Sequence, residues 1–363
     1  MKTLKFFSPL LMLLVLLTGC KKNDSITDAG QLPSAANAVY IVNEGGYNKG
    51  NASLTMYLPD AGTAYQDLFA SVNGRNLGDV AQDMVIYGKN AYIVVNNSQK
   101  IEVVTLESMK SVGTITIPGS KAPYKIAIYS DTKGYVTNLY DNSVTVFNPT
   151  TLAIVKERIP VGLNPQEIIL ANGKLFVCNS GYGADSTVSV IDPLTDVVVN
   201  TIVVGKSPMQ IAASVDGKLI VNCAGVSTDY TDQTKGIPGS IVKIDPATQT
   251  VTGSLVLPTS VYGHPSKMVV SPLGYAYVAV MGSVLKMETA TMTVVNPKFI
   301  PLTTENVYGM GYDNTTNRLY LADAGGFVSA GTVTIYDATG QNITSFKSGI
   351  APSTIVFKAS AKY

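Results

Sequence analysis

GYVTNLYDNSVTVFNPTT, residues 134–151, reads as two short strands separated by a break and followed by a turn. The first strand is YVTN (135–138), and the second ends at Asn148-Pro149, where proline removes a backbone donor and favours a turn. The same unit recurs along the chain, with further copies beginning at Val39, Tyr92, Phe176, Leu219, Tyr277 and Leu319. Seven copies, roughly 40 to 60 residues apart, have the length that a four-stranded propeller blade needs.

Each unit continues into an outer strand, such as 197–204, then a Gly-x-x-Pro element such as 205–208, and then an innermost strand. Strands of this kind, joined by Gly, Pro, Asn and Asp turns and without a convincing helical stretch, predict an all-β fold. We therefore expect a seven-bladed β-propeller over residues 38–363.

Closure of the ring is also predicted. The chain begins its first unit at a second strand, 39–43, and the C-terminal segment 352–357 matches an innermost strand. The C-terminal strand is expected to complete the first blade, which leaves no open radial edge. Hydrophobic residues make up 46% of the chain and charged residues 14%, with 32 Gly and 18 Pro, as a fold of buried strands and tight turns requires.

The N-terminus carries targeting features. Residues 1–19 have a basic start and an apolar run that is too short to span a bilayer, so they read as a cleaved signal peptide. Leu17-Thr18-Gly19-Cys20 resembles a bacterial lipobox, which implies lipidation of Cys20; the alternative is an ordinary signal with a chance cysteine. Residues 20–37 are polar and read as a flexible tether.

Net charge argues against a nucleic-acid partner. Removing the two lysines of the signal peptide leaves 24 basic and 25 acidic residues. Proteins that bind nucleic acid through phosphate contacts need a strong basic excess.

Few residues offer catalytic or metal chemistry. His264 is the single histidine, so a multi-histidine metal centre is excluded, and nothing places a nucleophile beside it. It reads either as a loop residue that hydrogen-bonds the backbone or as a ligand contact. Asp229 and Asp232 are a weak calcium candidate. Cys178 and Cys223 end equivalent strands, and both a disulfide and two buried free thiols are open. We expect no enzyme and no bound cofactor or metal.

Loop lengths distinguish the two faces of the predicted ring. Turns between first and second strands are short, whereas loops between second and third strands include long inserts at 43–51, 179–185, 223–239 and 323–331. Length variation on one face of a rigid scaffold usually marks a binding surface. The tyrosines and amides of this face suit a large, mostly uncharged polar ligand or a protein surface.

Residues just before each innermost strand should surround the channel mouth on this face, and these include Lys125 and Glu167. Asn43, Asn138 and Asn179 have an alternative role, because a strand-ending amide can hydrogen-bond loop N–H groups. The predicted ligand-binding residues are Asn43, Glu44, Asp83, Asn96, Tyr124, Tyr140, Gln166, Tyr182, Gln210, Tyr230, His264, Lys267, Tyr308 and Phe327.

The YVTN unit resembles the repeat of YncE-like propellers over about residues 38–357. Val42-Asn43-Glu44-Gly45 and Asn51-Ala52-Ser53-Leu54, after a lipobox, resemble the BtuG-type surface lipoproteins of Bacteroidetes. This resemblance implies capture of vitamin B12 (cobalamin) or another corrinoid and transfer to a BtuB-like TonB-dependent outer-membrane transporter. It also implies a lipid-anchored location on the outer membrane, facing outward, and Lys21-Lys22-Asn23-Asp24 resembles an export tag. The repeat itself is specific for fold and nearly silent on ligand.

Two other functions stay open. One is a protein-interaction or adhesion propeller with no small ligand. The other is a lyase of the kind that some propellers host, which would depend on His264 alone.

Overall fold

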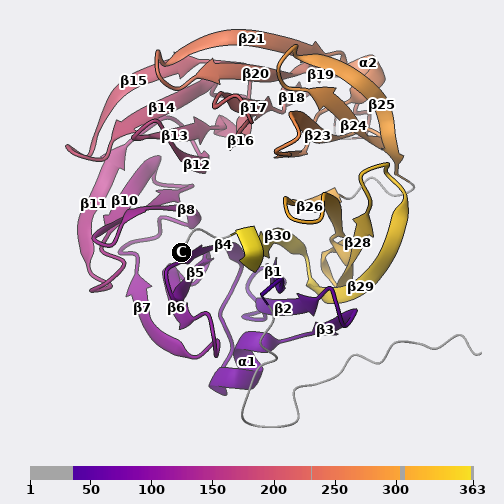
Figure 1. Cartoon of the computed structure of the whole chain (residues 1–363). Coiled ribbons are helices and arrows are strands. Elements are labelled where there is room, and N and C mark those ends of the chain that lie inside the picture. The colour runs from indigo at the N-terminus through magenta and orange to yellow at the C-terminus, as the bar shows by residue number, and fades with distance from the viewer. Residues whose placement is uncertain (1–35, 230, 303–306, 361–363) are drawn as a thin grey trace, which may run out of the picture.

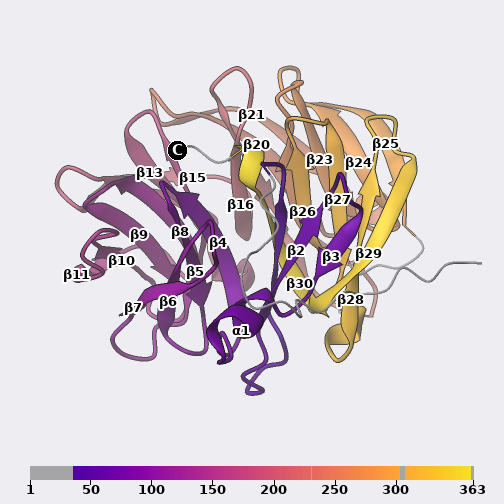
Figure 2. The same ribbon diagram turned by 60° about the horizontal axis from the view of Figure 1, so that its bottom comes forward.

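The computed structural model describes residues 36–229, 231–302 and 307–360. Within these residues the chain forms antiparallel sheets that follow one another around a central axis (Figure 1). A view from another side shows strands running between two faces of the ring (Figure 2). The predicted signal peptide, Cys20 and all but the end of the tether lie outside the described residues.

Five of the described sheets have four strands each, which run in chain order from the innermost strand outward. They are β4 (Ala81–Tyr87), β5 (Asn90–Val95), β6 (Lys100–Thr105) and β7 (Ser111–Thr116); β8 (Pro123–Ser130), β9 (Lys133–Asn138), β10 (Ser143–Phe147) and β11 (Ile154–Pro160); β12 (Pro165–Ala171), β13 (Lys174–Asn179), β14 (Thr187–Asp192) and β15 (Val197–Val203); β16 (Pro208–Ala213), β17 (Leu219–Cys223), β20 (Gly239–Asp245) and β21 (Thr250–Leu257); and β22 (Lys267–Val270), β23 (Tyr275–Val280), β24 (Ser283–Glu288) and β25 (Thr293–Pro301).

The remaining large sheet contains both ends of the described chain. Its order is β29 (Asn342–Ile350), β28 (Ala330–Tyr336), β27 (Arg318–Asp323), β26 (Val307–Asp313), β30 (Pro352–Phe357), β1 (Val39–Asn43), β2 (Ser53–Leu58) and β3 (Thr63–Tyr65). A single parallel pair, Met310 with Thr354, joins β26 to β30. In contrast, β30 pairs with β1 over its length, from Val39 opposite Phe357 to Asn43 opposite Pro352. The predicted pairing of the C-terminal strand with the first strand is confirmed.

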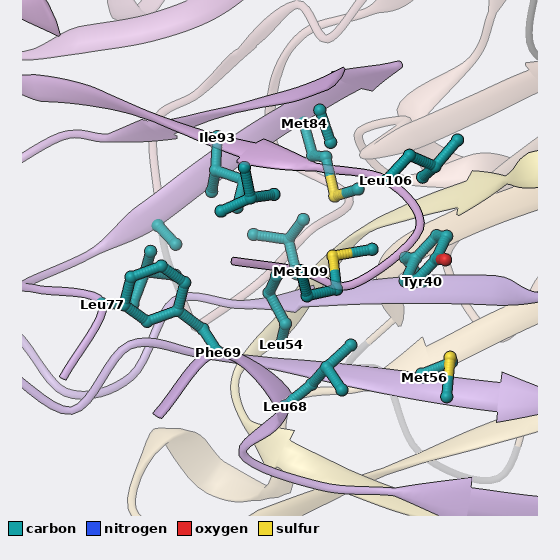
Figure 3. Packing of buried hydrophobic residues seen from close by; sticks show 14 of the residues in the cluster. Tyr40, Leu54, Met56, Leu68, Phe69, Leu77, Met84, Ile93, Leu106 and Met109 are labelled. Carbon is teal, nitrogen blue, oxygen red and sulfur yellow. The ribbon is translucent and has the colours of Figure 1, made fainter. Parts of the chain in front are cut away.

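Buried strands pack face to face between neighbouring sheets. Every residue of β9 after Lys133 is buried, whereas the outer strand β15 is mostly exposed, because only inner strands have a sheet on both sides. Figure 3 shows one such layer, where Leu54 and Met56 meet Met84 and Ile93 of the next sheet. Burying each large apolar side chain contributes roughly 1.5 to 3 kcal/mol, so these layers hold the ring together.

Two short helices depart from the expectation of no helical stretch. In α1 (Leu68–Asn73), Leu68 and Phe69 are fully buried in the layer of Figure 3. Because β3 has only three residues, it leaves part of β2 uncovered, and α1 packs there. The second helix, α2 (Thr259–Tyr262), is a single turn.

The two faces differ as the loop lengths predict. Antiparallel pairing places the turns β8–β9, β12–β13, β16–β17 and β22–β23 on one face, here called the plain face. The loops β1–β2, β13–β14, β17–β20 and β27–β28 lie on the other, here called the loop face. The β17–β20 insert contains a small hairpin, β18 (Val226–Ser227) and β19 (Gly236–Ile237), and the innermost strands begin on this face.

Candidate ligand-binding site

A cavity of about 590 Å³ lies along the ring axis. Its lining residues come from the innermost strands β4, β8, β12, β16, β22, β26 and β30. At the loop face the lining is polar, and it includes Tyr124, Gln166 and Ser353; farther in, Ile211, Val270 and similar side chains make it apolar. A cavity of this size, with polar groups converging at one end, is where a ligand is expected.

An ion pair crosses from the β4 sheet to the β8 sheet at the polar end. Lys125 Nζ lies 3.3 Å from Asp83 Oδ1 and 3.1 Å from Thr354 Oγ1, and Asp83 Oδ2 accepts from the amide of Ile126. Burial lowers the pKa of Lys125, but Asp83, Glu167 and Tyr124 together outweigh burial and raise that pKa above its ordinary value. Lys125 is thus held charged in a fixed position at the cavity wall.

Glu167 and Lys267 line the same end of the cavity without forming an ion pair there. Burial raises the pKa of Glu167 to about 7, against the opposing attraction of Lys125. Burial, together with repulsion from Lys125, lowers the pKa of Lys267 to about 8. Both charges are therefore poorly solvated and respond to whatever enters the cavity.

Glu44 occupies the first long loop and is buried beside the cavity mouth. Tyr308 donates its hydroxyl to Glu44 Oε2 at 2.8 Å, and Lys267 Nζ lies 5.2 Å from the centre of the Tyr308 ring. Burial raises the pKa of Glu44, which Tyr308 and Lys267 partly offset. Phe327 packs edge-on against Tyr308, with ring centres 4.9 Å apart. The loop β1–β2 and β27–β28 inserts thus meet above the cavity.

Exposed aromatic side chains surround this mouth. Tyr140 is 67% exposed, Tyr182 63% and Phe327 48%. Tyr182 adopts the left-handed conformation (φ 46°) inside the 3₁₀ turn Gly181–Gly183, a backbone state that few non-glycine residues take. Electrostatic coupling of Tyr124 to Tyr182 shows that the exposed ring lies near the cavity wall. Rings displayed in this way offer flat apolar area, and the two tyrosines add hydroxyl groups.

Several predicted ligand contacts have structural partners instead. Asn43 is fully buried; it donates to Ser53 and Thr55 and accepts from Ser348, tying β1 to β29. Asn138 and Asn179 also have structural partners, because their amides donate to hydroxyls on the next strand. The expected hydrogen bonds to loop N–H groups are absent, since neither Oδ1 has a partner among the described residues. Gln166 donates to Ser180 Oγ, and Asn96 donates to the carbonyl of Pro123.

His264 holds the β17–β20 insert in place. Its Nδ1 lies 3.0 Å from the carbonyl oxygen of Ala224 and its Nε2 2.9 Å from that of Lys235. Both ring nitrogens therefore contact the backbone, the first of the two roles that the sequence allows. The ammonium of Lys235 lies between Asp229 and Asp232, at 3.2 and 3.3 Å, so both carboxylates of the calcium candidate are engaged in ion pairs. Tyr230 lies outside the described residues.

Cys178 and Cys223 are buried free thiols, so of the two alternatives the unbridged one holds. Burial raises the pKa of both thiols. Raised thiol pKa values and burial make both cysteines unreactive structural residues.

The structure therefore brings Glu44, Asp83, Tyr124, Gln210, Lys267 and Tyr308 together at the mouth, with Tyr182 and Phe327 above them. Tyr140 lies at the rim. The predicted ligand residues omit Lys125 and Glu167, although their place before innermost strands marks them as mouth residues. Ser353 and Thr354 were missed altogether; their position in the C-terminal innermost strand is the signal that identifies them.

Fold and site define the class of protein: an all-β, propeller-like ring of four-stranded sheets with a polar, aromatic-rimmed mouth on one face. The chain belongs to the DUF5074 family, a domain of unknown function whose model matches residues 37–358. No curated protein matches it in sequence. Neither described helix is long and apolar enough to span a bilayer.

Solved structures with a similar fold come from several bacteria. A putative 6-phosphogluconolactonase from Bacteroides uniformis has a TM-score of 0.66 at 12% identity, covering 88% of this chain and 99% of that one. A quinonprotein alcohol dehydrogenase-like protein from Bacteroides thetaiotaomicron has a TM-score of 0.65 at 17% identity, with coverages of 89% and 78%. A functionally unknown protein from Desulfotomaculum acetoxidans has a TM-score of 0.64 at 16% identity, with coverages of 88% and 98%. At these identities the likeness shows the fold alone.

Proposed function

We propose that this chain is a surface lipoprotein that captures a corrinoid at the mouth of the loop face and passes it to a BtuB-like TonB-dependent transporter. The observation that carries the proposal is the mouth itself. Exposed rings of Tyr182 and Phe327 stand over a cavity of about 590 Å³ whose polar end holds Glu167 and Lys267.

The chemistry of a corrinoid suits this mouth. A corrinoid presents a broad macrocycle with a rim of primary amides, so aromatic rings can pack against its apolar parts while polar side chains hydrogen-bond the amides. A complete corrinoid, with its side chains and nucleotide, is larger than the cavity, and it would rest on the rim with one edge directed inward. Because both nitrogens of His264 contact backbone oxygens, cobalt coordination has no part in the proposal.

The number of blades in the ring is part of the same proposal. We count the eight-stranded sheet as two blades, because β26 and β30 share only the pair Met310–Thr354 while each has its own complete set of antiparallel partners. With the five four-stranded sheets this gives seven blades. Lipidation of Cys20 and a location on the outer face of the outer membrane rest on the sequence features of residues 1–37.

Retention of cyanocobalamin, which is pink, tests the proposal. Purified chain mixed with cyanocobalamin and then desalted is expected to stay pink with one equivalent of ligand. The double variant Tyr182→Ala/Phe327→Ala should lose at least about tenfold in affinity, which is about 1.4 kcal/mol. Leu273→Ala, an exposed apolar side chain on a plain-face turn, is the matched control and should bind as the wild type does. A colourless wild-type protein would remove the corrinoid from the proposal.

A protein-interaction role is the second candidate, and the exposed apolar side chains of the loop face favour it. Tyr47 is 69% exposed and Val328 84%, and large apolar side chains exposed on a binding face are available for protein contacts. This role predicts that the chain pulls down an outer-membrane partner and that Tyr47→Ser weakens the complex while corrinoids have no effect.

A further inference from the structure

Three side chains from adjacent innermost strands meet at the polar end of the cavity. Glu167 comes from β12, Gln210 from β16 and Lys267 from β22, each near the start of its strand. All three line the cavity. Around the ring they therefore present a carboxylate, an amide and an ammonium in sequence.

These three groups keep hydrogen-bonding capacity that the protein does not use. Across residues 36–229, 231–302 and 307–360, Lys267 forms no ion pair and donates no hydrogen bond; the face of Tyr308 lies against its ammonium, and the carboxylates of Glu44 and Glu167 act on it only electrostatically. Gln210 Oε1 accepts from the amide of Met268 at 2.7 Å, and its Nε2 has no acceptor in the same ranges. The carboxylate of Glu167 has the backbone amide of Ile168 beside it and no side-chain hydrogen bond in those ranges, although Lys125, Asp83 and Lys267 act on it electrostatically.

Lys125 lines the same end of the cavity as Lys267 but has hydrogen-bond partners within the protein. Its ammonium contacts Asp83, Thr354 and the carbonyl of Gln82. Lys267 and Glu167 influence each other electrostatically without forming an ion pair, so a gap separates them. Half-buried charges without partners are costly, and a group that fits the gap would recover that cost on binding.

Hydrogen-bonding chemistry restricts what fits. A carboxylate offers only acceptors, so it would suit Lys267 and Gln210 but repel Glu167. An ammonium offers only donors, so it would suit Glu167 and repel Lys267. A primary amide offers a carbonyl acceptor and an NH₂ donor within one planar group, and it complements both sides at once without a net charge.

We propose that Glu167, Gln210 and Lys267 form a subsite for a primary carboxamide, with the amide carbonyl directed at Lys267 and Gln210 and the amide NH₂ at Glu167. This inference deepens the proposed function and rests on it for the identity of the whole ligand, since corrinoids carry such amides on their rim. The subsite itself rests on the three side chains.

The subsite is tested with two small probes that differ in one group, nicotinamide and nicotinate, at millimolar concentration and pH 7.5. Saturation-transfer NMR is expected to show binding of nicotinamide to the wild type and at least fivefold less signal for nicotinate. Lys267→Met should abolish the nicotinamide signal, and Lys298→Met, an exposed lysine on the outer strand β25, should leave it unchanged. Glu167→Gln should raise the nicotinate signal, because the repelling carboxylate is gone.

Circular dichroism confirms that each variant is folded before the probes are added. Equal signals for the two probes, or a nicotinamide signal that survives Lys267→Met in a folded protein, would overturn the subsite. Cyanocobalamin is added to the same wild-type sample as a separate arm. If nicotinamide behaves as expected and cyanocobalamin does not bind, the subsite stands and the corrinoid function fails. If cyanocobalamin binds but the two probes are not distinguished, the function stands and the subsite fails.

Discussion

Replacing Glu167 with glutamine should change how the stability of the protein depends on pH. Burial raises the pKa of Glu167 from its ordinary 4.5 to about 7, with Lys125 opposing and Asp83 reinforcing that rise. A carboxyl group whose pKa is higher in the folded than in the unfolded protein favours folding while it is protonated. That contribution is present below pH 4.5 and is lost as the pH rises to about 7.

The size of the effect follows from the two pKa values. A span from 4.5 to about 7 corresponds to about 3 kcal/mol, and water in the cavity reduces this to about 2 kcal/mol. Glutamine resembles the protonated acid, so Glu167→Gln should match the wild type near pH 4 and exceed its free energy of unfolding by about 2 kcal/mol at pH 8. Urea unfolding followed by circular dichroism at both pH values measures the difference. A difference in free energy of unfolding between wild type and variant that stays constant from pH 4 to pH 8 would refute the reasoning.

Two other substitutions test the buried polar groups. Hydrogen bonds from Arg75 and Lys100 outweigh the burial of Glu102 and hold its pKa below its ordinary value, so Glu102→Gln should cost about 2 kcal/mol at pH 7. In thermal unfolding that loss should shrink as the pH falls through the folded pKa; a loss that stays constant down to pH 3 would contradict the pairing. Asn222 is fully buried, and neither its Oδ1 nor its Nδ2 has a partner among the described residues, so Asn222→Leu should raise the free energy of unfolding by about 1 kcal/mol. Asn179→Leu, which removes two hydrogen bonds, should lower the free energy of unfolding by a similar amount. If urea unfolding showed Asn222→Leu to be less stable than Asn179→Leu, Asn222 would have an unseen partner.

The sequence predicts the strands and their order because the repeat places each strand end at Asn, Asp, Gly or Pro. It also identifies the C-terminal strand as an innermost one, and the pairing of Val39 with Phe357 follows from that. It does not predict α1, since six residues of ordinary helix propensity give no periodic signal and only the short β3 makes room for them. Tertiary packing, and not local helix propensity, therefore determines that α1 forms.

For the site, sequence position identifies which residues stand at the mouth but not how they pair. Lys125 and Asp83 belong to different sheets. Only the folded ring shows that Lys125 forms an ion pair with the Asp83 carboxylate, whereas Lys267 has the Tyr308 ring beside it and no ion pair among the described residues. For the same reason the sequence alone does not show the structural role of Asn43, whose hydrogen-bond partner Ser348 lies at the far end of the chain. Ion pairing and burial depend on contacts between repeats, which one repeat cannot reveal.

Hydrogen–deuterium exchange with and without saturating cyanocobalamin measures where the ligand binds. Capture at the mouth predicts slower exchange in the loop-face segments 44–52, 180–186 and 324–329, with the plain-face turns at 172–173 and 271–274 unchanged. Protection confined to the plain face, or no protection anywhere, would contradict a ligand site at the mouth of the loop face.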